Sequence, residues 1–420
     1  MPPEAERRAA PRPSLILGRL GPEPRDAVTH DIPADRRDAA CSDRSSPDHE
    51  LRHLARRLQA YALPNAARSI AQLLVTAAAL VMLWLGMWVS LGHGYWITLL
   101  LAVPAAGFLV RLFVLQHDCG HRSLFRSRLA NDLTGRVLGV FTLTPYEYWR
   151  RAHAAHHASS GNLDRRGIGE ITTLTVREYL GLSRWGRLVY WFYRHPLVLF
   201  GVGPPYLFVL KHRLPLDMPL LRSGAWRNLV ATNLAIVGMM LTLSLLVGPM
   251  ELLKLQLPIV LLAASAGVWL FYVQHQFEDS YWERNGRWSV HQAALQGSSY
   301  YSLPRLLQWL TASIGLHHIH HLCSRIPSYR LQECVDENPE LEQARRVTLG
   351  ESLRCARLSL WDEEAGRMIR FRDLPSRTAH FALPALRAEP QVPVGPVHRL
   401  AAAKNSLIQR SWAGSGDSQS

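Results

Sequence analysis

SIAQLLVTAAALVMLWLGMWVSLG, residues 69–92, decides the fold class because it contains no charged side chain. A helix of that length rises more than the roughly 30 Å hydrocarbon core of a bilayer. Similar apolar runs cover residues 95–115, 228–250 and 255–275. The sequence therefore predicts an all-α protein with four transmembrane helices, in which Arg111 extends from near the end of the second span to the lipid headgroups.

Basic residues are distributed unevenly around the four predicted spans. The links 93–94 and 251–254 contain a single Lys, whereas the loop 116–227 is rich in Arg. Because positive loops stay cytoplasmic, we predict that both termini and this loop are cytoplasmic. The formal net charge of +14 is spread over these flanks. It favours contact with anionic membrane lipid and acidic soluble partners, and we expect no nucleic-acid binding.

The rest of the chain is predicted to form a cytoplasmic helical cap between two disordered ends. Residues 1–50 lack a hydrophobic period and residues 376–420 are rich in Pro, Ala, Ser and Gly, so we predict a disordered leader, a membrane domain over 51–375 and a disordered tail. Residues 50–68 repeat apolar positions at helical spacing, which is typical of an amphipathic helix lying on the membrane. The apolar stretch 196–210, broken by Gly and Pro, indicates an interfacial or re-entrant segment and not a fifth span.

The cysteines indicate no disulfide framework. None belongs to a CxxC pair, and all fall on the predicted cytoplasmic side of the membrane, where thiols stay reduced. We therefore expect free thiols at Cys41, Cys119, Cys323, Cys334 and Cys355.

Histidines gather in three clusters near the ends of the predicted spans or in the loop between them. HDCGH places His117 and His121 four residues apart, on one face if the second span continues as a helix. HAAHH places His153, His156 and His157 within about 100° of helix circumference, so that three ring nitrogens can converge. Both spacings are those of metal ligands.

The third cluster, HHIHH at 317–321, repeats the HxxHH spacing if His317, His320 and His321 are counted. Helical periodicity alone does not choose this set, since His317, His318 and His321 would also share a face. The match to the second cluster leaves His318 as the extra residue. We predict that His318 packs beside the site or contacts a ligand, with a role as a ligand left open.

The number of clustered imidazoles bears on the number of metals. Eight exceed what one tetrahedral zinc needs, since it takes three or four protein ligands. They suit two metals of higher coordination number, and imidazole binds iron, copper, nickel or zinc. The clusters therefore predict a two-metal site without selecting the element.

The three clusters, with two predicted spans between the second and third, resemble the histidine boxes of the integral-membrane fatty acid desaturases. HHASSGNLDRRGIGE after the second box and SIGLHHIHHLCSRIPSYRLQEC around the third are similar to bacterial desaturases of the acyl-lipid, delta-12 or omega-6-like group. The resemblance covers about residues 65–340. It implies a non-haem di-iron site that uses O₂ and two electrons to remove two hydrogens from a saturated segment of a fatty acyl chain.

Carried over residue by residue, the resemblance implies which residues bind the two iron ions. The family has a further histidine between the second and third boxes, and His275 in FYVQHQFED matches it by position. The implied iron ligands are His275 and the eight box histidines, which are also the predicted catalytic residues: His117, His121, His153, His156, His157, His317, His320 and His321.

The chain departs from the family at Ser313, where related sequences commonly have an Asn four residues before the third box. A Ser side chain reaches less far, so we do not expect the same polar contact from this position. Four carboxylates are candidates to orient ligand N–H groups, with ordinary solvated loop acids as the alternative: Asp118, Asp164, Glu278 and Asp279.

The resemblance also implies partners. The substrate is a fatty acyl chain linked to a lipid, coenzyme A or a carrier protein, and it needs a narrow apolar tunnel. The sequence has no haem, flavin or iron–sulfur motif, so we expect a ferredoxin- or cytochrome-like electron donor, attracted by the basic surface. The alternatives are a related di-iron membrane hydroxylase or carotenoid-modifying oxygenase and, in another class, a metal-handling or transport protein. A transporter would place polar residues near the bilayer midplane, where these spans are apolar.

Overall fold

The computed structural model describes residues 47–214 and 225–374. The predicted tail and Cys41 lie outside the described residues, as does the predicted leader except for residues 47–50, which are helical. The predicted domain limits therefore stay predictions.

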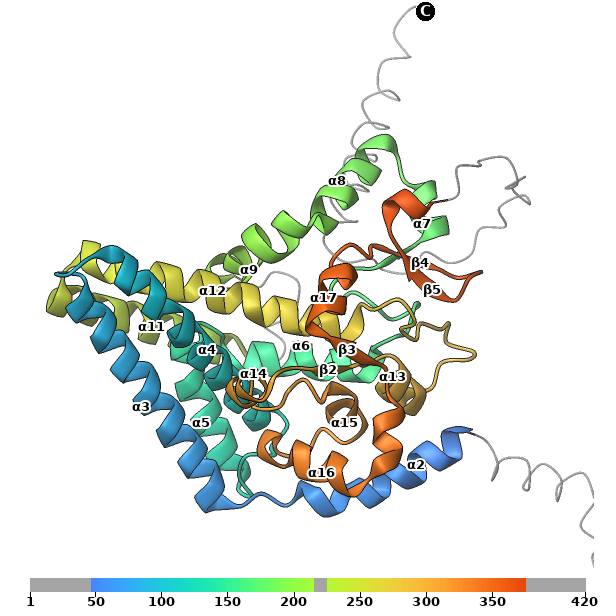
Figure 1. Cartoon of the computed structure of the whole chain (residues 1–420), viewed down its shortest axis with the longest axis horizontal. Helices are drawn as coiled ribbons and strands as arrows, with labels where there is room; N and C mark the ends of the chain where they lie inside the picture. The colour runs from blue at the N-terminus through green and yellow to red at the C-terminus, as the bar shows by residue number, and fades with distance from the viewer. Residues whose placement is uncertain (1–46, 215–224, 375–420) are drawn as a thin grey trace, which may run out of the picture. The chain divides into compact units, whose positions relative to one another are not determined.

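Four helices among the described residues are long and apolar enough to cross a membrane: α3 (Ala66–Ser90), α4 (Tyr95–Gly120), α11 (Ala225–Val247) and α12 (Pro249–His275). Figure 1 shows the turns of the two hairpins, α3–α4 and α11–α12, together at one end, and most of the shorter elements toward the other. The all-α prediction with four membrane helices is confirmed. Asn65 caps α3 through a side-chain bond from the Arg68 N–H (3.0 Å), which places its start slightly before the predicted span.

Short elements make up the rest of the described chain. The helices are α2 (Pro47–Arg57), η1 (Leu58–Ala62), α5 (Arg128–Phe141), α6 (Tyr146–Ser159), α7 (Val176–Gly181), α8 (Arg184–Arg194), α13 (Val290–Gln296), α14 (Arg305–Leu310), α15 (His317–Leu322), η5 (Ser328–Arg330), α16 (Leu331–Glu337), η6 (Pro339–Gln343), α17 (Leu349–Cys355) and η7 (Phe371–Asp373). Strand β4 (Leu360–Asp362) pairs in parallel with β1 (Leu174–Thr175) and antiparallel with β5 (Arg367–Ile369), while β2 (Tyr300–Ser302) pairs in parallel with β3 (Arg346–Thr348). These strands tie the C-terminal described segment to loops that follow α6 and α12.

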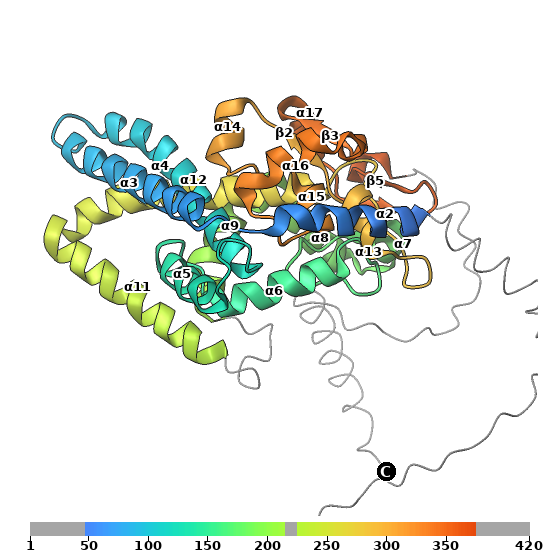
Figure 2. The same cartoon turned by 90° about the horizontal axis from the view of Figure 1, so that it is seen from below.

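Helix α4 lies at the centre of the membrane helices, in contact with α3 and α12. Ala102 and Ala105 of α4 are fully buried and share a cluster with Met87 of α3 and Leu255 of α12. Small residues allow helix backbones to approach closely in lipid. Helix α11 packs instead against α5, α6 and α12, and Figure 2 shows it diverging from the α3–α4 hairpin. The membrane helices thus hold the ends of α4 and α12 beside α6.

Arg111 does not extend to the headgroups, so that prediction is wrong. Its side chain is buried, donates hydrogen bonds to Thr76 Oγ1 (3.2 Å), Gln72 Oε1 and the Trp309 carbonyl, and lies over the Trp309 ring. Since α4 continues to Gly120, Arg111 is well inside the helix. Acceptors on α3 and α14 satisfy the buried guanidinium, which joins three helices.

The helix before the first span was predicted to lie on the membrane, and the structure shows its apolar face against protein. Leu54 of α2 and Leu58 of η1 are buried in a cluster with Ile319 of α15 and with Leu331 and Cys334 of α16. The same periodicity that suits a membrane surface also suits a protein core, so periodicity did not distinguish the two. The segment therefore shares a hydrophobic core with the helix that carries the third histidine cluster.

The stretch predicted to be interfacial or re-entrant is helical and does not qualify as a span. It consists of η2 (Val198–Val202), α9 (Gly203–Pro205), η3 (Tyr206–Leu210) and η4 (Lys211–Arg213), with π-helical turns on both sides of two prolines that lack an N–H donor. Leu197, Val202 and Leu210 are exposed. Its position relative to a membrane stays a prediction.

Candidate metal centre

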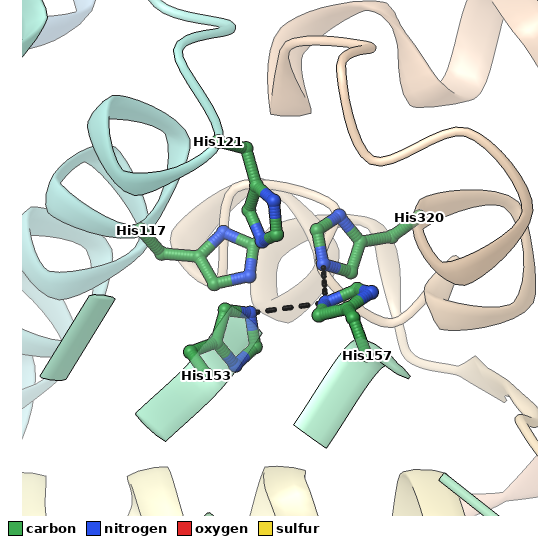
Figure 3. A group of neighbouring side chains, drawn as sticks. All are labelled: His117, His121, His153, His157 and His320. Carbon is green, nitrogen blue, oxygen red and sulfur yellow. Dashed lines mark hydrogen bonds between the residues drawn. The ribbon is translucent and has the colours of Figure 1, made fainter. Parts of the chain in front are cut away.

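The structure brings all nine predicted histidines together, in two groups. The five-histidine group is His117, His121, His153, His157 and His320, and the four-histidine group is His156, His275, His317 and His321. Within each group, one nitrogen of every ring lies within 4.8 Å of the others. Figure 3 shows the rings of the five-histidine group converging from α4, α6 and α15.

Helical spacing explains how the histidines divide. The pairs four residues apart, 117/121, 153/157 and 317/321, each stay within one group, because residues at i and i+4 share a helix face. The remaining histidine of the second and third clusters, His156 or His320, is directed to the other group. The three rings that the spacing allowed to converge are therefore divided, with His153 and His157 in one group and His156 in the other.

Nitrogen atoms face one another at distances that favour a cation between them. In the four-histidine group, His275 Nε2 lies 3.1 Å from His156 Nε2 and 2.9 Å from His317 Nε2, and His321 Nε2 lies 3.1 Å from His317 Nε2. A single proton on His317 Nε2 can be donated to only one of its two neighbours, His275 Nε2 or His321 Nε2. In the five-histidine group, His117 and His121 have buried Nε2 atoms without a hydrogen-bond partner in the described structure. Converging imidazole lone pairs fit a transition metal.

The protonation of these rings also suits metal binding. Burial, together with the neighbouring imidazoles, holds the pKa well below its usual value for seven of them: His121, His153, His156, His157, His317, His320 and His321. Neutral imidazole is the form that binds a metal. These seven side chains can therefore present nitrogen lone pairs at neutral pH.

Two contacts that orient histidines of these groups were not predicted from the sequence. His275 Nδ1 lies 3.1 Å from the Gly297 carbonyl, a contact that leaves Nε2 facing the site. The Trp149 ring stacks on His153 with centroids 4.7 Å apart. A Cβ at Gly120 would lie 2.8 Å from the Trp149 ring, so the glycine of HDCGH makes room for that ring. The sequence feature that could have identified Trp149 as a neighbour of the site is its position one helical turn before His153.

The four carboxylates proposed to orient ligands, all in the described part of the chain, accept no hydrogen bond from a site histidine. Asp118 Oδ1 is 3.5 Å from His117 Nδ1, while Asp118 Oδ2 accepts from the Ser328 N–H (2.8 Å). The other three lie elsewhere: Asp164 bonds Arg284 and the Asn285 N–H, Glu278 pairs with Arg367, and Asp279 is exposed.

His318 and Ser313 stand apart from the two groups. His318 is fully buried, belongs to neither group and packs near the Tyr300 ring. Burial lowers its pKa to about 4. Ser313 has a φ of 58°, in the left-handed region that Asn tolerates better than Ser.

A cavity of about 730 Å³ adjoins both groups. One histidine of each cluster lines it, His117, His153 and His317, and most of the other lining residues are apolar. Most of them come from α4, α12 and the segment 198–212, and others from α6 and the loop 167–172. The cavity can therefore hold a long apolar ligand against the histidines.

Comparisons with known proteins agree with this geometry. The family model described as Fatty acid desaturase matches residues 94–351. The chain is 43% identical to a fatty acid desaturase of Bacillus subtilis, over 77% of this chain and 92% of that protein. It is 29% identical to an sn-1 acyl-lipid omega-3 desaturase (ferredoxin) of Synechocystis sp., over 60% of this chain and 67% of that one. It is 30% identical to an endoplasmic reticulum omega-3 fatty acid desaturase of Vigna radiata, over 55% and 62%. The chain therefore belongs to the fatty acid desaturase family.

Proposed function

We propose that each histidine group binds one iron ion and that the pair of ions serves the desaturation of a fatty acyl chain with O₂. The observation that carries this proposal is the division of nine histidines into two groups that share the second and third clusters. Since α6 and α15 each supply ligands to both groups, the two ions would be held at a fixed separation. Family membership decides against the metal-handling or transport alternative.

The bound iron would supply the activation of O₂ that an unactivated C–H bond requires and that side-chain acids and bases cannot provide. In the balanced reaction the acyl chain loses two hydrogens and gains a double bond. The two hydrogens, together with two electrons, two protons and O₂, give two water molecules. The protein's own residues position the chain and exclude water.

The cavity supports an acyl substrate. Leu109, Phe113 and Val114 of α4 line it together with Val260 and Ala264 of α12. These side chains would hold a saturated segment of the chain beside His117, His153 and His317. An acyl chain linked to a lipid is the form we propose, because apolar side chains of the segment 198–212 both line the cavity and face outward.

The electron donor is proposed to be an acidic soluble protein of the ferredoxin or cytochrome type. The formal net charge of +14 would attract such a carrier to the protein. Desaturation rates measured with a ferredoxin should then fall as ionic strength rises. A rate that is indifferent to salt would contradict electrostatic attraction of the donor.

The orientation is part of the same proposal. The two hairpin turns would face away from the cytoplasm, and the histidines would lie on the cytoplasmic side of a bacterial inner membrane. The Arg-rich sequence between the second and third spans supports this orientation.

Metal analysis tests the di-iron proposal. Protein purified in detergent after growth with iron should contain about two iron atoms per chain, as nine imidazoles suit two ions. His320→Ala should lower that number, whereas His93→Ala, at the exposed α3–α4 turn, should not. Folded wild-type protein that holds no iron after loading would contradict the proposal.

A further inference from the structure

The loop GIGE, residues 167–170, follows the second histidine cluster and contributes no ligand to either group. Gly169 has a φ of 70°, and a Cβ there would lie 2.5 Å from the Ala152 carbonyl oxygen and 3.3 Å from His156 Cβ. Only glycine fits so close to α6. The loop is therefore held against the turn of α6 that carries His156.

A cavity of about 10 Å³ lies where this loop meets the four-histidine group. Glu170, His156, His275 and Trp282 are among its lining residues, and Glu170 is the one carboxylate among those that line it. A space of this size holds about one water molecule when polar groups surround it.

Two buried donors at this cavity have no protein partner among the described residues: His156 Nδ1 and Trp282 Nε1. His156 Nε2 faces His275 Nε2 at 3.1 Å, so Nε2 is the atom directed to the four-histidine group. If that atom binds a metal, the ring proton lies on Nδ1, and a buried N–H needs an acceptor. His275 has such an acceptor in the Gly297 carbonyl, whereas His156 requires one from the cavity.

We propose that Glu170 positions the metal ligand His156 through one water molecule in this cavity. The water accepts hydrogen bonds from His156 Nδ1–H and Trp282 Nε1–H and donates one to the Glu170 carboxylate. This inference rests on the proposed function, because it assigns a role to Glu170 only when His156 binds a metal.

The surroundings of Glu170 strengthen such a contact. The Gly167 N–H donates to Glu170 Oε1 (2.7 Å), which fixes the direction of the carboxylate. A carboxylate behind a ligating histidine raises metal affinity.

Metal retention in detergent-solubilised protein tests the role of Glu170. The variants are Glu170→Gln, which keeps the shape and loses the charge, Glu170→Asp, which keeps the charge, and Asp279→Asn as an exposed control with the same change of charge. Each protein is loaded with iron and challenged with a chelator, and iron per chain is followed over time. The melting temperature of the metal-free form is measured in parallel.

Glu170→Gln should release one of its metals about 10-fold faster or more and pass through a form with about one iron per chain, while the other ion stays. Glu170→Asp should be intermediate, and Asp279→Asn should match the wild type. Metal-free Glu170→Gln should melt within a few degrees of the wild type. Should Glu170→Gln not fold, the comparison rests on Glu170→Asp, where release at the wild-type rate overturns the proposal.

Two outcomes overturn the role of Glu170 while the proposed function stands. One is wild-type retention of both metals in Glu170→Gln. The other is parallel loss of both metals with a lowered metal-free melting temperature, which indicates a structural role only. The proposed function fails separately, if the wild type itself binds no iron.

Discussion

His317 and His318 are adjacent, both buried, and differ in what they face. His317 Nε2 lies within 3.1 Å of the Nε2 atoms of His275 and His321, whereas His318 lies outside both groups. The sequence allowed the choice between them only because HAAHH has Ala at the position that His318 occupies in HHIHH. The candidate ligand from another segment, His275, was predicted from the resemblance and not from any spacing.

Replacement of each residue should separate these roles. His317→Ala should lose metal from the four-histidine group and abolish desaturation. His318→Gln should keep its iron and some activity, and lose about 1 kcal/mol of stability because a buried side chain is changed. Iron per chain and fatty acid analysis of the two variants give the comparison. Equal loss of iron in both would contradict the assignment.

Ser313 adopts a left-handed backbone conformation that is unfavourable for a serine. A non-glycine residue at a φ of 58° is strained, and Asn tolerates this conformation better. Ser313→Asn should therefore raise the free energy of unfolding by about 0.5 kcal/mol, seen as a higher melting temperature of the metal-free protein. A lower melting temperature would show that the Ser side chain has a role of its own.

Helix α6 shows what helical periodicity can predict and what it cannot. Its three histidines lie within one sector of the helix, as the spacing predicted, but the sector faces two centres. Which partner helices approach from each side depends on packing between segments far apart in the sequence, and spacing within one helix contains no information on it. The same limit explains why α2 was assigned to the membrane surface.

The contact between α6 and the GIGE loop gives a prediction with a matched control. Gly169→Ala would place a methyl group 2.5 Å from the Ala152 carbonyl, while Gly366→Ala, at a φ of 62°, meets nothing within 4 Å. Gly366→Ala should cost about 1 kcal/mol for its backbone alone. Gly169→Ala should cost clearly more and release iron faster, because the turn that carries His156 must move. Equal melting temperatures and iron release would contradict the contact.

Across the whole molecule, the apolar runs predicted the membrane helices well and the cap poorly. Lipid imposes a length and a composition on a span, so α3, α4, α11 and α12 were found within a few residues. The short strands and the burial of Arg111 depend on tertiary contacts, which no local pattern records. The histidine clusters could be found in the sequence because only a few residue types bind metals.

Orientation can be tested by labelling with a membrane-impermeant maleimide in spheroplasts. The background is Cys41→Ser with Cys323→Ser, since the remaining thiols are buried and burial raises the pKa of Cys334 to about 12 and of Cys355 to about 11. His93→Cys at the α3–α4 turn should react in intact spheroplasts. Arg165→Cys, exposed in the loop after α6, should react only after lysis. The reverse pattern would contradict the proposed orientation.

The central claim is that these histidines form the metal site of an acyl-chain desaturase. Its most direct test is expression in a host that lacks such enzymes, followed by mass spectrometry of fatty acid methyl esters. Wild-type protein should produce a new double bond that depends on O₂ and an electron donor, and His320→Ala should produce none. Unchanged lipids, despite membrane-inserted wild-type protein loaded with iron and supplied with a reduced donor, would contradict the account.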